Sequence, residues 1–165
     1  MPDLEIIVMV GVPCSGKSAW ANKHWDYYNV VNNDRFARLF GVNYDARLFP
    51  YLRVMEGAYI RASIVGQGRS VIADSTNVTR RSRERYISLA EELGVRCIAV
   101  YKEVLLGEVL EWNSARERNK RLPEQVIRNM FQRLEIPSVD EGFQRVIISS
   151  TLRSRCAGLL SCESY

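Results

Sequence analysis

The sequence contains a single histidine, His24, and this scarcity limits the metal chemistry available to the chain. The four cysteines are spread out, with no pair at two-residue spacing: Cys14, Cys97, Cys156 and Cys162. Structural zinc is held by closely spaced cysteines and histidines. We therefore expect no structural zinc site, and we interpret His24 as a residue on a helix surface.

Long apolar runs are also absent. No stretch approaches the roughly 20 residues that a membrane-spanning helix needs. The first residues, MPDLE, are acidic, whereas a secretory signal begins with basic side chains. The sequence thus predicts a cytoplasmic protein with no membrane partner.

Neither sign of charge dominates, because 23 lysines and arginines face 19 acidic residues. The net charge of +4 suits an anionic partner, but ATP alone would satisfy it, so it does not by itself indicate nucleic acid. No repeat, low-complexity stretch or linker divides the 165 residues. We expect one domain over 1–150, followed by a tail over 151–165 to which no function is assigned.

One short stretch carries the strongest signal. Residues 11–18 read GVPCSGKS, which fits G-x-x-x-x-G-K-[ST], the pattern of a phosphate-binding P-loop. An apolar run over 6–10 precedes it and a run without helix breakers follows, which is the strand–loop–helix context that the motif requires. The pattern predicts ATP, or another nucleoside triphosphate, and Mg²⁺ as ligands. The predicted nucleotide-binding residues are Gly11, Pro13, Cys14, Ser15, Gly16, Lys17 and Ser18.

Within this loop, the motif assigns separate tasks to individual side chains. Lys17 reaches the β- and γ-phosphates, and the Ser18 hydroxyl is a ligand of Mg²⁺. Cys14 is interpreted as a small filler of the loop, with redox control of the loop as the alternative.

Apolar runs alternate with helical patterns along the chain. Strands are predicted over 5–10, 28–32, 70–73, 96–101 and 146–148. Helices are predicted over 17–25, 51–65, 79–93, 105–119 and 124–134. This alternation indicates an α/β fold with a parallel sheet and right-handed crossovers.

Two carboxylates follow predicted strands, Asp34 after the second and Asp74 after the third. Ligands of an open parallel sheet bind beyond the carboxyl ends of its strands, so both should lie beside the P-loop. We take Asp34 as the candidate base for a hydroxyl acceptor, and Asp74 as a group that holds a magnesium-bound water or the acceptor. The alternative for each is a helix N-cap.

The run RERNKR over 116–121 is dense in positive charge and precedes Pro123. It predicts a helical lid whose arginines fold over the phosphates and exclude water, with Arg116 as the first arginine to test. The alternative is a solvated helix end.

Other arginines form a cluster over 80–85 or are scattered between the second and third strands. We expect some of them to contact an acceptor phosphate. Most are interpreted as exposed faces of helices: Arg35, Arg38, Arg47, Arg53, Arg61, Arg80, Arg81, Arg83 and Arg85.

Beyond the P-loop, the chain carries a set of short motifs at 33–35 (NDR), 74–77 (DSTN), 112–116 (WNSAR), 122–123 (LP), 135–137 (EIP) and 141–143 (EGF). With these motifs the chain resembles the P-loop kinases of the polynucleotide 5′-hydroxyl kinase type and the small kinases around them. The match covers about 5–148. It implies a five-stranded sheet of order 2-3-1-4-5, flanked by helices and carrying a helical lid.

The resemblance also implies roles for individual residues. Lys17, Asp34 and Arg116 match catalytic residues, with Asp34 as the general base and Arg116 on the transferring phosphoryl group and nucleotide. Ser18 is implied as a metal-binding residue, and Asp74 is predicted as a second one because it follows an apolar strand, as a Walker-B acid does. The acceptor-side residues are Asp34, Arg38, Asp74, Thr76 and Asn77.

Two positions depart from the pattern of the polynucleotide kinases. The residue three positions after the base is Ala37, and the arginine follows at Arg38. Ser75 stands directly before the Thr-Asn pair, and the acid comes one position earlier, at Asp74. Both departures lie on the acceptor side, so they bear on the identity of the substrate and not on ATP binding.

The expected function is therefore an ATP-dependent kinase acting on a hydroxyl, most plausibly the 5′-OH of a nucleic-acid end. A small-molecule or aminoacyl-tRNA hydroxyl is the alternative acceptor. A nucleotide-binding ATPase or switch without an acceptor is the alternative of another class.

Overall fold

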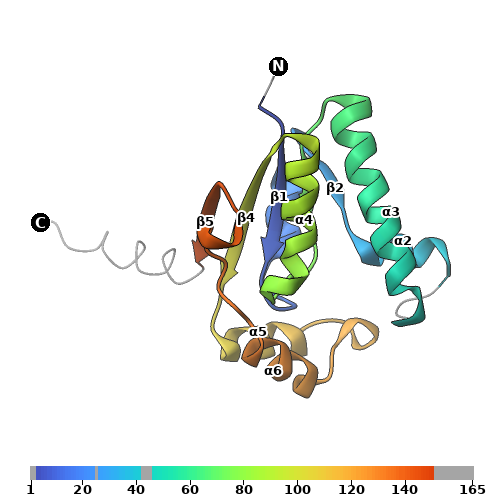
Figure 1. Ribbon diagram of the computed structural model, residues 1–165. Helices are drawn as coiled ribbons and strands as arrows, with labels where there is room; N and C mark the ends of the chain where they lie inside the picture. Colours follow the sequence, from blue (N-terminus) through green and yellow to red (C-terminus); the bar gives the residue numbers. More distant parts are fainter. Residues whose placement is uncertain (1–2, 25, 42–45, 151–165) are drawn as a thin grey trace, which may run out of the picture.

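The computed structural model describes residues 3–24, 26–41 and 46–150, and its centre is a five-stranded parallel sheet (Figure 1). The order is β2-β3-β1-β4-β5, so the predicted order is confirmed. All four neighbouring pairs are parallel. The strands are β1 (Glu5–Val10), β2 (Asn29–Val31), β3 (Val71–Ala73), β4 (Arg96–Glu103) and β5 (Arg145–Ser150).

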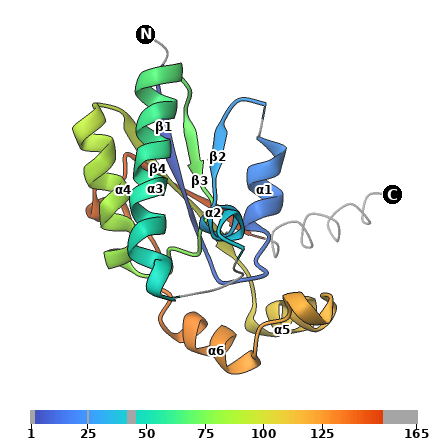
Figure 2. The same ribbon diagram turned by 90° about the vertical axis from the view of Figure 1, so that its right-hand side faces the viewer.

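Helices cover both faces of the sheet. Figure 2 shows α3 and α4 on one face and α1 on the other, while α5 and α6 lie together beyond one end of the strands. The helices are α1 (Lys17–Lys23), α2 (Asn33–Leu39), α3 (Phe49–Arg61), α4 (Arg80–Leu93), α5 (Leu106–Ser114) and α6 (Glu124–Gln132). A π-helical turn over Ala62–Gly66 continues α3, and 3₁₀ turns occur at Ala46–Leu48, Arg118–Lys120 and Val139–Glu141.

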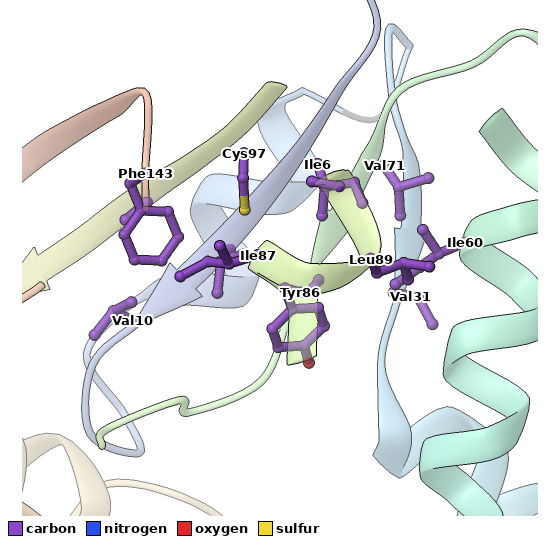
Figure 3. Close-up of a cluster of buried hydrophobic side chains, with 14 of the residues drawn as sticks. Ile6, Val10, Val31, Ile60, Val71, Tyr86, Ile87, Leu89, Cys97 and Phe143 are labelled. Carbon is purple, nitrogen blue, oxygen red and sulfur yellow. The ribbon is translucent and has the colours of Figure 1, made fainter. Parts of the chain in front are cut away.

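Strand β1 is buried along its whole length, because both of its faces meet helices. Ile6, Val8 and Val10 point to the α3–α4 side, where Tyr86 and Ile87 of α4 pack (Figure 3). The alternate residues of β1 form a second cluster with α1: Ile7 and Met9 pack with Ala21 and Trp20. Burial on both faces explains why this strand reads as a continuous apolar run.

A third apolar cluster joins α5 and α6 to the loop that follows β1. Its buried members are Val12, Val104, Val109 and Ile127. Residues 105–134 thus form a helical lid with a small core of its own, which sits at the carboxyl ends of the strands (Figure 1).

Several predicted element ends differ from the structure, most of all the end of α5. Helix α5 ends at Ser114, whereas a helix was expected to continue to 119. The side chain of Asn113 bonds the backbone of Leu122, donating to its carbonyl at 2.8 Å and accepting from its N–H at 2.9 Å. This contact closes the chain into a loop. Strands β4 and β5 each run two residues further than expected, to Glu103 and Ser150.

The interpretation of Arg83 as part of an exposed helix face is wrong. Its side chain is fully buried and forms an ion pair with Glu141, with Nε and Nη2 donating at 2.7 and 2.6 Å. Its Nη1 donates to the carbonyls of Asn77 and Glu135, each at 3.0 Å. Glu135 follows α6, so Arg83 fastens the end of the lid to α4.

The expected tail over 151–165 lies outside the described residues. Within the described part of the chain, no helix combines the length and the apolar character needed to cross a membrane.

Candidate functional site

The loop between β1 and α1 has the tight backbone that its glycines predict. Gly11 has φ +150°, and a Cβ there would lie 2.8 Å from Ser15 Oγ and 3.2 Å from the carbonyl oxygen of Lys102. Gly16 has φ +84°. The Gly11 N–H donates to the carbonyl of Thr76 at 3.0 Å, which ties the loop to the segment after β3. Any residue other than glycine at position 11 would therefore displace Ser15 or the backbone of Lys102.

Lys17 points into this loop. Its Nζ donates to the Val12 carbonyl at 2.7 Å and lies 3.5 Å from Ser15 Oγ, and the residue is only 8% exposed. Burial lowers the pKa of Lys17 to about 8, although Asp74, Cys14 and Asp34 each act in the opposite direction. A buried ammonium surrounded by backbone groups is suited to bind a phosphate. The negative charge of the phosphate would favour the protonated form of Lys17, which burial disfavours.

Ser18 and Asp74 meet beside Lys17. Ser18 Oγ donates to Asp74 Oδ2 at 2.7 Å, and the Nδ2 of Asn32 donates to the same oxygen at 2.9 Å. Asp74 follows β3 directly and is buried. The sequence predicted Ser18 and Asp74 as a pair, whereas Asn32 was not anticipated; its position after β2 was the available signal.

A hydroxyl and a carboxylate oxygen are suitable ligands for Mg²⁺. In the described residues there is no cluster of three or more histidine, cysteine or acidic side chains that would bind a metal unaided. Mg²⁺ is usually held by one or two carboxylates together with water and substrate phosphates. The pair Ser18–Asp74 fits such a site, in which a nucleotide supplies the remaining ligands.

Asp34 lies in the first turn of α2, a short helix that the sequence did not predict. The N-cap of α2 is Asn32, whose Oδ1 accepts from the Asp34 N–H at 2.8 Å, and the N-cap of α4 is Thr79. The alternative that Asp34 and Asp74 are helix caps is therefore wrong. The Asp34 carboxylate is exposed and close enough to Lys17 to raise its pKa.

The other acceptor-side residues divide into two groups. Arg38 is exposed, one helical turn after Asp34, and is available to a ligand. Asn77 is buried with φ +44°, and its Nδ2 donates to the Met9 carbonyl at 3.0 Å. Thr76 accepts from Gly11 through its carbonyl. The backbone of Thr76 and the side chain of Asn77 thus hold the P-loop in place.

A cleft of about 320 Å³ runs between the P-loop and the lid. On the lid side, Arg116 Nη1 lies 3.4 Å from Cys14 Sγ, so the predicted lid arginine reaches the loop. The lid also contributes Trp112, to which the sequence assigned no role. The residues that line the cleft are Cys14, Gly16, Lys17, Ser18, Ala19, Trp112 and Arg116.

A protein-family model described as an AAA domain matches residues 6–137, which is most of the chain. The chain belongs to this family of P-loop kinases. The match includes the P-loop, both carboxylates and the lid. The likeness to small kinases inferred from the short motifs is thereby confirmed at the level of the family.

This P-loop kinase is similar to two curated proteins that are both longer. It is 30% identical to the "Bifunctional polynucleotide phosphatase/kinase" of Schizosaccharomyces pombe, over 86% of this chain and 32% of the relative. It is 25% identical to the "L-seryl-tRNA(Sec) kinase" of Methanococcus maripaludis, over 80% of this chain and 53% of the relative. The chain thus spans about a third and about half of these relatives.

Among solved structures, a chain of the Pnkp1/Rnl/Hen1 RNA repair complex superposes with a TM-score of 0.70 at 20% identity. The match covers 79% of this chain and 44% of that chain. At this identity the likeness concerns the fold alone.

Proposed function

We propose that this P-loop kinase transfers the γ-phosphoryl group of ATP to the 5′-hydroxyl of a polynucleotide. The observation that carries the proposal is the placement of Asp34 beside the P-loop, exposed and within electrostatic reach of the buried Lys17. A nucleotide-binding switch would have no need of a second, exposed carboxylate there. The similarity to a bifunctional polynucleotide phosphatase/kinase supports a nucleic-acid acceptor.

The proposed chemistry assigns one task to each side chain. Asp34 accepts the proton of the acceptor hydroxyl while the hydroxyl oxygen forms a bond to the γ-phosphorus. The bond between the γ-phosphorus and the β–γ bridging oxygen breaks, which releases ADP. Lys17 and Arg116 offset negative charge on the phosphates. Ser18 and Asp74 would hold Mg²⁺, which neutralises charge on the phosphate oxygens when it is bound.

The first test combines a 5′-OH oligonucleotide with γ-labelled ATP and follows labelled product. The Asp34→Asn variant keeps the size of the side chain but accepts a proton poorly, so we expect the transfer rate to fall by about 100-fold or more. ADP affinity, measured below about pH 8 where Lys17 is protonated, should change little, since Asp34 acts on the acceptor. Asp26→Asn, a change at an exposed aspartate outside the cleft, is the matched control.

Two results would contradict the proposal. An absence of label on every DNA and RNA end tried with the wild-type protein would remove the polynucleotide assignment. Wild-type transfer by Asp34→Asn would remove the role of Asp34 as the base.

A second acceptor class has support from the similarity to an L-seryl-tRNA(Sec) kinase. Measuring ADP release with seryl-tRNA, nucleosides and sugars as acceptors would reveal such an activity. An ATPase without any acceptor would be indicated if Asp34→Ala left ATP turnover intact while Lys17→Ala abolished it.

A further inference from the structure

The cleft beside the P-loop has two kinds of lining. The P-loop contributes the groups already assigned to phosphoryl transfer, Lys17 and Ser18, with Asp74 bonded to Ser18. The rest of the lining includes Ala19 of α1 and Trp112 and Arg116 of the lid. Among the described residues that line the cleft, Trp112 is the only aromatic one.

We propose that the indole of Trp112 is the platform on which the nucleobase of the bound nucleotide stacks. This inference rests on the nucleotide-binding part of the proposed function and not on the identity of the acceptor. Nothing in the family match or in the short motifs assigned a role to Trp112.

The placement of the nucleotide follows from the P-loop. The motif assigns the β- and γ-phosphates to Lys17 and their Mg²⁺ to Ser18. The nucleoside therefore occupies another part of the same cleft, and the lining residues that remain for it include Ala19 of α1 and Trp112 of the lid.

Trp112 is held in a way that suits a stacking surface. Its side chain is half-buried, packs against the apolar core of the lid and also lines the cleft. The neighbouring Asn113 is buried and bonded to Leu122, which limits the freedom of this part of the lid. A fixed aromatic ring loses little conformational entropy when a base stacks on it.

Arg116, four residues further along the chain and beyond the end of α5, lines the same cleft. Its Nη1 lies 3.4 Å from Cys14 Sγ of the P-loop, so its guanidinium is placed to offset charge on the phosphates. The lid therefore supplies a ring for the base and a cation for the phosphates of one ligand.

The test separates the base from the phosphates by comparing ADP with inorganic tripolyphosphate, which has no base. Affinities of both are measured by titration calorimetry for the wild type, Trp112→Leu and Trp112→Phe. We expect Trp112→Leu to weaken ADP binding on the order of 10-fold while tripolyphosphate binding changes by less than about 2-fold. Trp112→Phe, which retains an aromatic ring, should recover most of the ADP affinity.

Trp20→Phe serves as the matched control, because Trp20 stacks on His24 with ring centroids 3.9 Å apart and does not line the cleft. An equal loss of ADP and tripolyphosphate affinity in both Trp112 variants would overturn the proposal, since it would mean that the lid or the loop had been disturbed. Unchanged ADP affinity in Trp112→Leu would overturn it as well. Neither readout uses an acceptor, so a failure of the polynucleotide assignment would leave the result interpretable.

Discussion

Lys17 is the residue at which burial and charge oppose each other most directly. It is almost fully enclosed by the P-loop, and this burial holds its pKa at about 8, below the ordinary value of 10.5. The unfolded chain therefore binds more protons than the folded protein between about pH 8 and pH 10.5, and the cost of burying the charge is relieved as the pH rises through that window. Nucleotide binding should depend on pH in the opposite sense.

We expect ADP affinity to be constant below about pH 8 and to fall by up to tenfold per pH unit above it. The phosphates raise the pKa of Lys17 in the complex, so binding above pH 8 has to take up a proton that the free protein has lost. Titration calorimetry in buffers of different ionisation enthalpy measures both the affinity and this proton uptake. Affinity that stayed level up to about pH 9.5 would contradict the prediction, and Lys17→Met should show weak binding without the dependence.

At the residue scale, the sequence predicted the groups that a motif specifies and missed those that act through tertiary contacts. Lys17, Ser18 and Asp74 converge as their spacing indicated. The bond from Asn32 to Asp74 joins residues 42 positions apart, and no local pattern encodes it. Arg83 was misread for the same reason, because its partner Glu141 lies on the far side of the lid in the chain.

At the scale of elements, the end of the lid is fastened to α4 by several bonds. Glu135 accepts from Arg83 through its carbonyl, donates its N–H to the Val78 carbonyl at 2.8 Å, and accepts from the Arg80 N–H through its carboxylate. The pair between Arg83 and Glu141 is fully enclosed, with side chains 0% and 2% exposed. Removing Arg83 would deprive two carbonyls of their donor and would leave the buried carboxylate of Glu141 with only Arg80, at 4.0 Å, and the Ser138 N–H as partners.

We expect Arg83→Met to lower the free energy of unfolding by about 3–5 kcal/mol, as breaking buried ion pairs does. Arg81→Met, a change on the exposed side of the same helix, should stay within about 0.5 kcal/mol. Urea denaturation followed by circular dichroism measures both. A loss below about 1 kcal/mol in Arg83→Met would show that the ion pair contributes less to the free energy of unfolding than its burial indicates.

Long elements were predicted well from periodicity, whereas short ones depended on contacts outside them. The pattern over 79–93 corresponds closely to α4, whose Thr79 cap and terminal Gly94 are readable signals. Helix α2 has only seven residues, too few for a periodic pattern, and begins where Asn32 caps it. Helix α5 ends early because the side chain of Asn113 bonds Leu122. The residues over 115–119 carry no local signal for this contact.

At the scale of the whole molecule, the parallel sheet brings the P-loop, Asp34 and Asp74 together at the carboxyl ends of its strands. Arg38 is exposed one helical turn after Asp34, and it makes no ion pair within the part of the chain that the structure describes. A polynucleotide acceptor would contact further cations along its backbone, while a small acceptor needs only those next to Asp34. Salt concentration should distinguish the two.

We expect the Michaelis constant for a 5′-OH oligonucleotide to rise steeply between about 50 and 200 mM salt, by about 2.6-fold for each phosphate contact. A nucleoside 3′-phosphate, offered as a short acceptor in parallel reactions, should show a much weaker dependence. Equal salt dependence of the two acceptors would argue against an extended nucleic-acid contact.

The lid leaves the core next to the buried Val104 and rejoins it at the bonded Glu135. Between these two ends, its apolar core also packs on Val12 of the loop after β1. Trp112 and Arg116 are tied into the same segment, since Asn113 holds Leu122 and Arg121 Nε donates to the Arg116 carbonyl at 2.7 Å. A displacement of this segment would therefore carry Trp112 and Arg116 together, so that both side chains would reach a bound nucleotide in the same step.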